Sequence, residues 1–342
     1  MKRIVALFVC MMLLTGCAAP AVQTKATVYE ATFLELFDTV TVVKGPAESK
    51  EVFDETARFV HDELERYHQL FDVYNSYEGL NNLKTVNDMA GIGPVEVDGA
   101  IISLLLDCRS YHELTGGKVD VTLGSVLRLW HDARNDGLND PAAARLPDPE
   151  DLQKAAEHRG FDCLVIDEAA STVYITDPDM MLDVGAVAKG WAAQKVAEQM
   201  PANMLLSVGG NVCATGPKTA AGDPWVIGVQ NPDHTGAQYL HTLYVTGGSY
   251  VTSGDYQRAY MVDGEIYHHI IDPETLMPSR YWRSVTVVCD DSGLADALST
   301  ALFVLPQEQG QALLDQCGAM AMWVDAGGKV YYSPGFEEII RT

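Results

Sequence analysis

The sequence predicts an α+β fold in which mostly antiparallel or mixed sheets are flanked by helices. Residues 50–71 show a helical repeat of apolar residues, which indicates a long amphipathic helix. Between residues 204 and 271, short apolar runs alternate with Gly-Gly and Asn-Pro turns, a pattern typical of antiparallel strands. A regular strand–helix–strand rhythm is missing, which disfavours a doubly wound parallel sheet. The apolar stripe of the long helix consists of Phe53, Ala57, Val60, Leu64 and Tyr67.

The remaining elements follow from local signals in chain order. Residues 33–43 alternate between apolar and polar types and predict a strand. A helix is expected to begin at Asp98 and to end at a glycine C-cap, Gly116–Gly117. Residues 135–149 are polar and contain proline, so we expect a surface loop there, suited to a lid.

Two further signals complete the prediction of secondary structure. Asp148 followed by Pro149 is typical of an N-cap with proline at the first helical position. Residues 320–332 are apolar on either side of an A-G-G-K sequence, which predicts a closing hairpin.

The first residues predict a bacterial lipoprotein. A basic Lys2-Arg3 pair precedes an apolar run over residues 4–14, and L-T-G-C then ends at Cys17. This run is too short to span a bilayer, so it resembles a lipoprotein signal peptide over residues 1–16. Cys17 would be lipidated, residues 17–30 would form a tether, and the protein would be anchored to the membrane on its extracytoplasmic face. A plain signal peptide with an incidental cysteine is the alternative.

Composition limits the classes of partner. The formal net charge of −24 argues against nucleic acid and against electrostatic binding to anionic lipid. It also disfavours an anionic ligand, so such a ligand would need a local cation at its site. Five cysteines remain beyond residue 17, an odd number without paired spacing, which is typical of small core residues and allows at most two disulfides.

The most informative motif is D-V-G-A-V-A-K-G over residues 183–190. Val184, Val187 and Trp191 lie at helical spacing, so we expect a helix that begins near Gly185. Free N–H groups at a helix start, glycines and a lysine one turn later suit a phosphate-bearing ligand. An ordinary capped helix with a packed glycine is the alternative.

A second helix start lies at residues 291–303. Asp296 and Thr300 are four residues apart, so they lie on one face of a helix. A carboxylate and a hydroxyl are hard oxygen donors, which suit Mg²⁺ better than zinc. The alternative is that both residues form the polar edge of an apolar core helix.

Histidine is the side chain most available as a base near pH 7, and His268 and His269 are adjacent. We prefer His269, because neighbours on a strand point to opposite faces and only one can face the site. A half-buried histidine bonded to the backbone is the alternative.

Four further motifs occur in a fixed order with these. They are V-D-V-T-L-G at residues 119–124, S-V-G-G-N at 207–211, T-S-G-D-Y at 252–256 and H-I-I-D-P at 269–273. In this order the chain resembles the ApbE family of FAD:protein FMN transferases from about Phe33 to near its C-terminus. The resemblance implies a T-fold-like architecture over residues 31–342. It also implies transfer of the FMN half of FAD, with Mg²⁺ or Mn²⁺, onto a Thr or Ser hydroxyl of an extracytoplasmic flavoprotein, with release of AMP.

The resemblance also assigns roles to residues of this chain. His269 would take the proton of the hydroxyl, with Asp296 as the second catalytic group. The metal ligands would be the Ala186 carbonyl and the side chains of Asp296 and Thr300. FAD contacts would come from Asp183, Lys189, Lys118, Val119, Asp120 and Ile270, and a stacking tyrosine from Tyr74 or Tyr77.

Two positions depart from the family pattern. Leu276 stands where many members have glycine, and Asn211 stands where many have aspartate. Two other functions remain open from sequence alone. One is an FAD pyrophosphatase that uses the same residues with water in place of the hydroxyl, and the other is a non-catalytic flavin-binding lipoprotein.

Overall fold

The computed structural model describes residues 27–233 and 236–341. The predicted signal peptide (residues 1–16), Cys17 and most of the predicted tether lie outside this part of the chain. Residues 27–30, which sequence reasoning assigned to the tether, instead form the first half of strand β1 (Thr27–Phe33). The folded domain therefore begins no later than Thr27.

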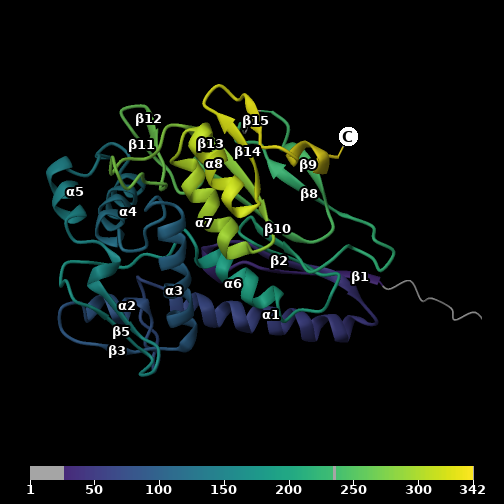
Figure 1. The fold of residues 1–342 in the computed structure, drawn as a ribbon, viewed down its shortest axis with the longest axis horizontal. Helices are drawn as coiled ribbons and strands as arrows, with labels where there is room; N and C mark the ends of the chain where they lie inside the picture. Colours follow the sequence, from purple (N-terminus) through teal and green to yellow (C-terminus); the bar gives the residue numbers. More distant parts are fainter. Residues whose placement is uncertain (1–26, 234–235, 342) are drawn as a thin grey trace, which may run out of the picture.

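The centre of the fold is an eight-stranded sheet in which every neighbouring pair is antiparallel (Figure 1). This confirms the predicted α+β class. Its spatial order is β1-β2-β6-β7-β10-β13-β14-β15. After β1, the strands are β2 (Thr41–Ala47), β6 (Leu205–Val208), β7 (Asn211–Ala214), β10 (Gly248–Gly254), β13 (Trp282–Cys289), β14 (Met320–Asp325) and β15 (Val330–Tyr332).

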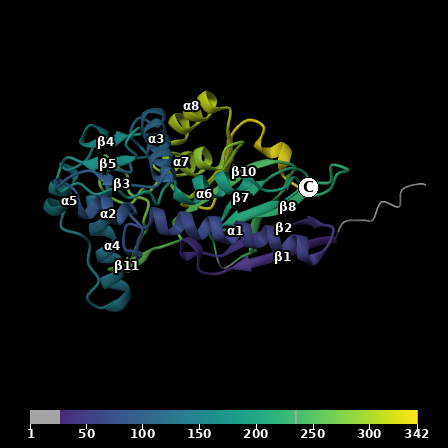
Figure 2. The same cartoon turned by 90° about the horizontal axis from the view of Figure 1, so that it is seen from below.

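Helices α1 (Lys50–Phe71), α6 (Ala188–Ala197) and α7 (Ser292–Phe303) pack on one face of the sheet (Figures 1 and 2). The hairpin of β8 (Trp225–Gln230) and β9 (Tyr239–Val245) covers the other face with the short helix η3 (Phe336–Ile339). Side chains of β14 alternate accordingly: Trp323 lies in the core under the helices, and Met322 in the core under the hairpin. This is the period of two expected for a sheet buried on both faces.

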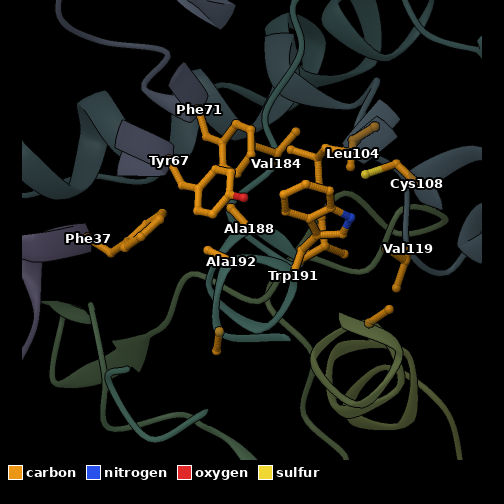
Figure 3. Close-up of a cluster of buried hydrophobic side chains, with 14 of the residues drawn as sticks. Phe37, Tyr67, Phe71, Leu104, Cys108, Val119, Val184, Ala188, Trp191 and Ala192 are labelled. Carbon is orange, nitrogen blue, oxygen red and sulfur yellow. The ribbon is translucent and has the colours of Figure 1, made fainter. Parts of the chain in front are cut away.

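Trp191 of α6 joins the helices into one core (Figure 3). Its ring lies 5.5 Å from the rings of both Tyr67 and Phe71 of α1, in edge-on geometry. Its indole N–H donates to Asp107 of α3 (Gly99–Leu114) at 2.8 Å. A buried aromatic ring of this size contributes a large apolar area, and its polar tip is satisfied. Contacts with α1 on one side and α3 on the other therefore fix the position of α6, the helix that begins within the 183–190 motif.

A second lobe lies at the end of the molecule away from β1 (Figure 1). It has its own apolar core, in which Trp130 of α4 meets Leu152 of α5 and Tyr260 of β11. Trp130 also donates its indole N–H to the carbonyl of Leu276 at 2.9 Å. The elements around this separate core are α4 (Gly124–Asn139), α5 (Pro149–Ala156), β11 (Tyr260–Val262) and β12 (Glu265–Tyr267). The lobe also contains η2 (Phe161–Cys163) and four elements whose buried side chains belong to the main core: α2 (Leu83–Asp88), β3 (Val95–Glu96), β4 (Leu164–Asp167) and β5 (Thr172–Ile175).

Most local predictions are confirmed. Helix α1 spans the predicted residues 50–71, and β14 and β15 form the predicted hairpin. Asp98, Asp148 and Asp291 cap α3, α5 and α7, each accepting a hydrogen bond from a backbone N–H of the first turn. The last helix before the hairpin, α8 (Gln307–Cys317), was not predicted.

Three predictions are wrong. Residues 33–43 are not one strand, because the short helix η1 (Leu36–Asp38) separates β1 from β2 and buries Leu36 and Phe37. Residues 135–139 are not a loop but the last turn of α4, which packs through Gly137 against the ring of Tyr260. Helix α6 begins at Ala188, three residues later than predicted, because residues 185–187 form a turn.

No helix in the described ranges is long and apolar enough to cross a membrane. Cys108, Cys163, Cys213, Cys289 and Cys317 are all free thiols in this part of the chain, and Cys108 and Cys213 are buried.

Candidate active site

A cavity of about 420 Å³ lies between the helix-covered sheet and the second lobe. Its walls come from the segments that carry the sequence motifs: residues 118–123, 183–189, the end of β10, residues 267–273 and α7. Helix α4 closes the remaining side through Leu127, Trp130, His131 and Arg134. The volume is within the usual range for a small-molecule site.

Asp296 lies in this wall and is only 4% exposed. Its Oδ2 accepts hydrogen bonds from the Gly190 backbone N–H at 2.8 Å and from the Asn211 side-chain amide at 3.0 Å. The Lys189 Nζ atom lies 3.8 Å from the same oxygen. Burial raises the pKa of the Asp296 carboxyl, and these three groups oppose that rise. The carboxylate is thus held through one oxygen.

Gly190 makes this contact possible. A Cβ atom there would lie 2.3 Å from the Ser292 carbonyl oxygen and 2.5 Å from the Cβ of Asp296. Both distances are far inside van der Waals contact, so any side chain at position 190 would force α6 and α7 apart. The glycine in the 183–190 motif is therefore required for the close approach of two helices.

The three residues predicted as metal ligands, Ala186, Asp296 and Thr300, line the same cavity. Within the described residues, Asp296 Oδ1, Thr300 Oγ1 and the Ala186 carbonyl oxygen make no hydrogen bond. Three free hard oxygens at one cavity suit a cation such as Mg²⁺, which prefers oxygen ligands and keeps room for water and phosphate. The residues present therefore fit a divalent cation.

The two neighbouring histidines both line the cavity, but they differ in their hydrogen bonds. The Nε2 of His268 faces the Ser279 carbonyl oxygen at 2.8 Å, and its Nδ1 accepts from the Ile270 N–H. Both nitrogens are thus used. The Nδ1 of His269 donates to the Gln257 carbonyl oxygen at 3.1 Å, since a carbonyl can only accept. The Nε2 of His269, without a partner among the described residues, can take a proton.

The hydrogen bonds favour His269, whereas strand alternation gives no reason to prefer it. Strand β12 ends at Tyr267, so both histidines lie in an irregular segment and strand alternation does not apply. Burial lowers the pKa of His269 to about 3, helped by the positive charges of Arg258, Lys189 and Arg134 and by His268. His269 is therefore neutral across the physiological range.

Six of the residues predicted to contact FAD lie at the cavity, but they differ in the groups that they can offer to a ligand. Lys118, Val119, Asp120, Asp183, Lys189 and Ile270 all line the cavity. Both backbone groups of Ile270 are already bonded, its N–H to His268 and its carbonyl to the N–H of Ser279. Ile270 can therefore pack against a ligand, but its backbone N–H is not free to donate a hydrogen bond to it.

Only one of the two candidate tyrosines reaches the cavity. Tyr74 lines it, 40% exposed, and stacks on the ring of His131 at 4.5 Å. Tyr77 lines neither this cavity nor the smaller one beside it, and its hydroxyl donates a hydrogen bond to Asp72 at 2.8 Å. Assignment of a stacking role to Tyr77 is therefore wrong for this structure.

Sequence reasoning missed several wall residues: Trp130, His131, Arg134, Arg258, Tyr260 and Tyr267. Arg258 lies two residues beyond the T-S-G-D-Y motif, so its position was available as a signal. The residues of α4 gave no signal, because the helix itself was not recognised.

Leu276 has a φ of 60°, in the left-handed region that favours glycine. A glycine, which the motif resemblance leads us to expect here, would adopt this conformation without strain. In this chain the leucine side chain is buried in the core of the second lobe, which offsets part of the backbone strain.

A second cavity of about 170 Å³ adjoins the first. The two share Asp38, Tyr74, Asp183, Gly185, Lys189 and Arg258 in their walls. Residues of the 183–189 segment therefore line both cavities, and the two together offer more room than the first cavity alone.

These features define the class of the protein: an α+β fold that presents free oxygen ligands, cations and a neutral histidine to one cavity. Residues 26–323 match the ApbE family, and the chain belongs to that family. An FAD:protein FMN transferase of Treponema pallidum is 34% identical over 278 residues, which cover 76% of this chain and 75% of the relative. One of Vibrio cholerae is 27% identical and covers 96% of each chain.

Solved structures agree with the fold. The crystal structure of the ApbE protein from Thermotoga maritima superposes with a TM-score of 0.80 at 30% identity, covering 92% of this chain and 100% of that one. The flavin transferase ApbE from Vibrio cholerae gives a TM-score of 0.73 at 24% identity, over 92% of this chain and 99% of that one.

Proposed function

We propose that the chain is an FAD:protein FMN transferase that moves the FMN half of FAD onto a Thr or Ser hydroxyl of a target flavoprotein and releases AMP. The observation that supports this best is the convergence of three unbonded oxygens, Lys189 and a neutral His269 on one cavity. The relatives and the Thermotoga structure carry the same activity or family in their names.

The reaction exchanges one bond at phosphorus. The hydroxyl oxygen of the acceptor forms a bond to the flavin-side phosphorus of FAD, and the bond from that phosphorus to the bridging oxygen breaks. The bridging oxygen leaves with AMP, and the proton of the hydroxyl passes to Nε2 of His269. Such a transfer depends on positioning and charge neutralisation more than on covalent help from the protein.

The wall residues divide this work. Mg²⁺, or Mn²⁺ in its place, would be held by the Ala186 carbonyl, Asp296 and Thr300, and when bound it supplies positive charge to the diphosphate. Lys189 remains close to Asp296, at 3.8 Å, and adds a second positive charge on that side. Tyr74 is partly exposed at the cavity and offers an aromatic surface for contact with a flat ring.

We also propose that the protein works at the extracytoplasmic membrane surface, held there by a lipid on Cys17. Cys17→Ser should abolish incorporation of labelled fatty acid and move the protein from the membrane fraction to the soluble fraction. Cys10→Ser is the matched control, because Cys10 lies within the apolar run and should leave both results unchanged. Membrane retention and labelling of the Cys17→Ser protein would contradict the anchor.

Removal of the Asp296 carboxylate tests the proposed chemistry. In Asp296→Ala, AMP release from FAD should fall on the order of 100-fold or more, because a cation ligand and its charge are lost. The assay follows AMP by chromatography and the acceptor by in-gel flavin fluorescence, with and without a Thr-bearing acceptor domain. Asp296→Asn provides a second variant of similar shape, and Asp290→Ala removes an exposed carboxylate outside the cavity.

The outcomes separate the three functions. A fluorescent acceptor together with AMP supports the transferase. AMP and free FMN without a labelled acceptor would identify a pyrophosphatase, and intact bound FAD would leave a flavin-binding protein. Equal activity of Asp296→Ala and Asp290→Ala would remove Asp296 from the mechanism.

The lowered pKa of His269 predicts an unusual pH profile. A histidine with an ordinary pKa of about 6.5 would lose about 20-fold of its neutral form between pH 7 and pH 5. Since burial and nearby cations lower the pKa of His269 to about 3, the neutral form persists across this interval. We expect kcat/KM for AMP release to change by less than about threefold between pH 7 and pH 5. A fall that follows a pKa near 6.5 would contradict the assignment of His269.

A further inference from the structure

Four basic side chains line the main cavity, and two of them are already paired with carboxylates. Lys118 lies 3.3 Å from Asp272 and 2.7 Å from Glu274. Lys189 lies 3.8 Å from Asp296. Both lysines thus already have a carboxylate partner within the protein.

Arg134 and Arg258 are different. Neither guanidinium forms an ion pair with a carboxylate of residues 27–233 or 236–341, although the chain carries 47 acidic residues against 23 basic ones. Arg134 only contacts His131 and Asn135, at 3.3 and 3.5 Å, and neither partner is an anion. Arg134 is half-buried and Arg258 is exposed at the cavity wall, so both guanidinium groups remain available to an anionic ligand.

The two arginines reach the cavity from separate elements and lie near one another. Arg134 comes from the last turns of α4, and Arg258 follows β10 directly. Burial and the positive charge of Arg258 lower the pKa of Arg134, and both arginines lower the pKa of His269. The three groups therefore lie close enough in space to influence one another.

The backbone at Arg258 has a φ of 43°. This left-handed conformation has an energetic cost for any residue with a Cβ atom. Glycine would remove that cost, yet an arginine occupies the position on the cavity wall. Strained residues of this kind are typical of ligand-binding sites.

We propose that Arg134 and Arg258 together bind the flavin-side phosphate of FAD, the group that the proposed reaction transfers. This inference rests on the proposed function. Guanidinium groups match phosphate oxygens in pairs of parallel hydrogen bonds and stabilise the charge that develops on a phosphoryl group in transfer. The location follows from His269, because the base must lie next to the oxygen that attacks this phosphorus.

Binding of this phosphate also affects His269. While the arginines are unpaired, their charges disfavour a proton on the imidazole. A phosphate between them cancels much of that charge, so the imidazole becomes a better proton acceptor only when the substrate is in place. Through the two arginines, binding of the substrate phosphate would thus increase the proton affinity of the His269 imidazole.

The test compares three ligands on single variants. FMN carries the flavin-side phosphate, riboflavin lacks it, and AMP carries the other phosphate. In Arg134→Gln and in Arg258→Gln, calorimetry or flavin fluorescence should show FMN binding weakened about 10- to 100-fold, with riboflavin and AMP binding unchanged. Arg58→Gln removes the same charge from an exposed site on α1, where Arg58 forms no hydrogen bond or ion pair with another described residue, and it should bind all three ligands like the unaltered protein.

Arg134→Lys and Arg258→Lys keep the charge without the planar fork, so they should lose part of the FMN affinity; they also serve if a glutamine variant does not fold. Equal weakening of FMN and riboflavin would overturn the proposal in favour of a packing role. Unchanged FMN binding with lost transfer to the acceptor would also overturn it, and would assign the arginines to the acceptor protein. An unaltered protein that binds FMN but releases no AMP from FAD would refute the proposed function alone.

Discussion

The buried contact between α6 and α7 determines the geometry of the whole site. At this contact the Asp296 carboxylate accepts the Gly190 N–H at 2.8 Å, and only glycine allows the two helices to approach so closely. A carboxylate that is 4% exposed is expensive unless its charge is compensated. One of its oxygens is satisfied by the protein, while the other remains available to the cavity. The packing of Trp191 against α1 and α3 keeps α6 in the position that this arrangement requires.

Charge organises the site at a second level. The chain is strongly acidic overall, and a doubly charged nucleotide would be repelled by such a surface. The cavity reverses this locally, since it gathers Lys118, Lys189, Arg134 and Arg258 around the place that a diphosphate would occupy. Within the part of the chain that the structure describes, the lysines are paired with carboxylates and the arginines are not. The cavity wall therefore carries two paired cations, Lys118 and Lys189, and two cations, Arg134 and Arg258, that a bound anion would pair with.

Much of this could be predicted from sequence because its causes are local. The amphipathic spacing of apolar residues predicted α1, and the capping aspartates predicted where three helices begin. Ordered motifs gave the family and the residues around Asp296. The rest depends on distant contacts. The last turn of α4 is polar and contains Gly137, so its sequence predicts a loop. In the structure the ring of Tyr260, a residue distant in sequence, packs against this turn. Arg134 was therefore not predicted as a site residue. The strand predicted from alternation over residues 33–43 is interrupted by the short helix at Leu36.

The central claim is that Asp296 is held through one oxygen so that the other can bind a cation beside FAD. A crystal structure with FAD and Mn²⁺, with anomalous data that locate the manganese, tests this most directly. The account predicts an anomalous peak in contact with the free oxygen of Asp296, the Thr300 hydroxyl and the Ala186 carbonyl, next to the diphosphate. Ordered FAD in the cavity with no manganese at Asp296, or with the metal bound elsewhere, would contradict it.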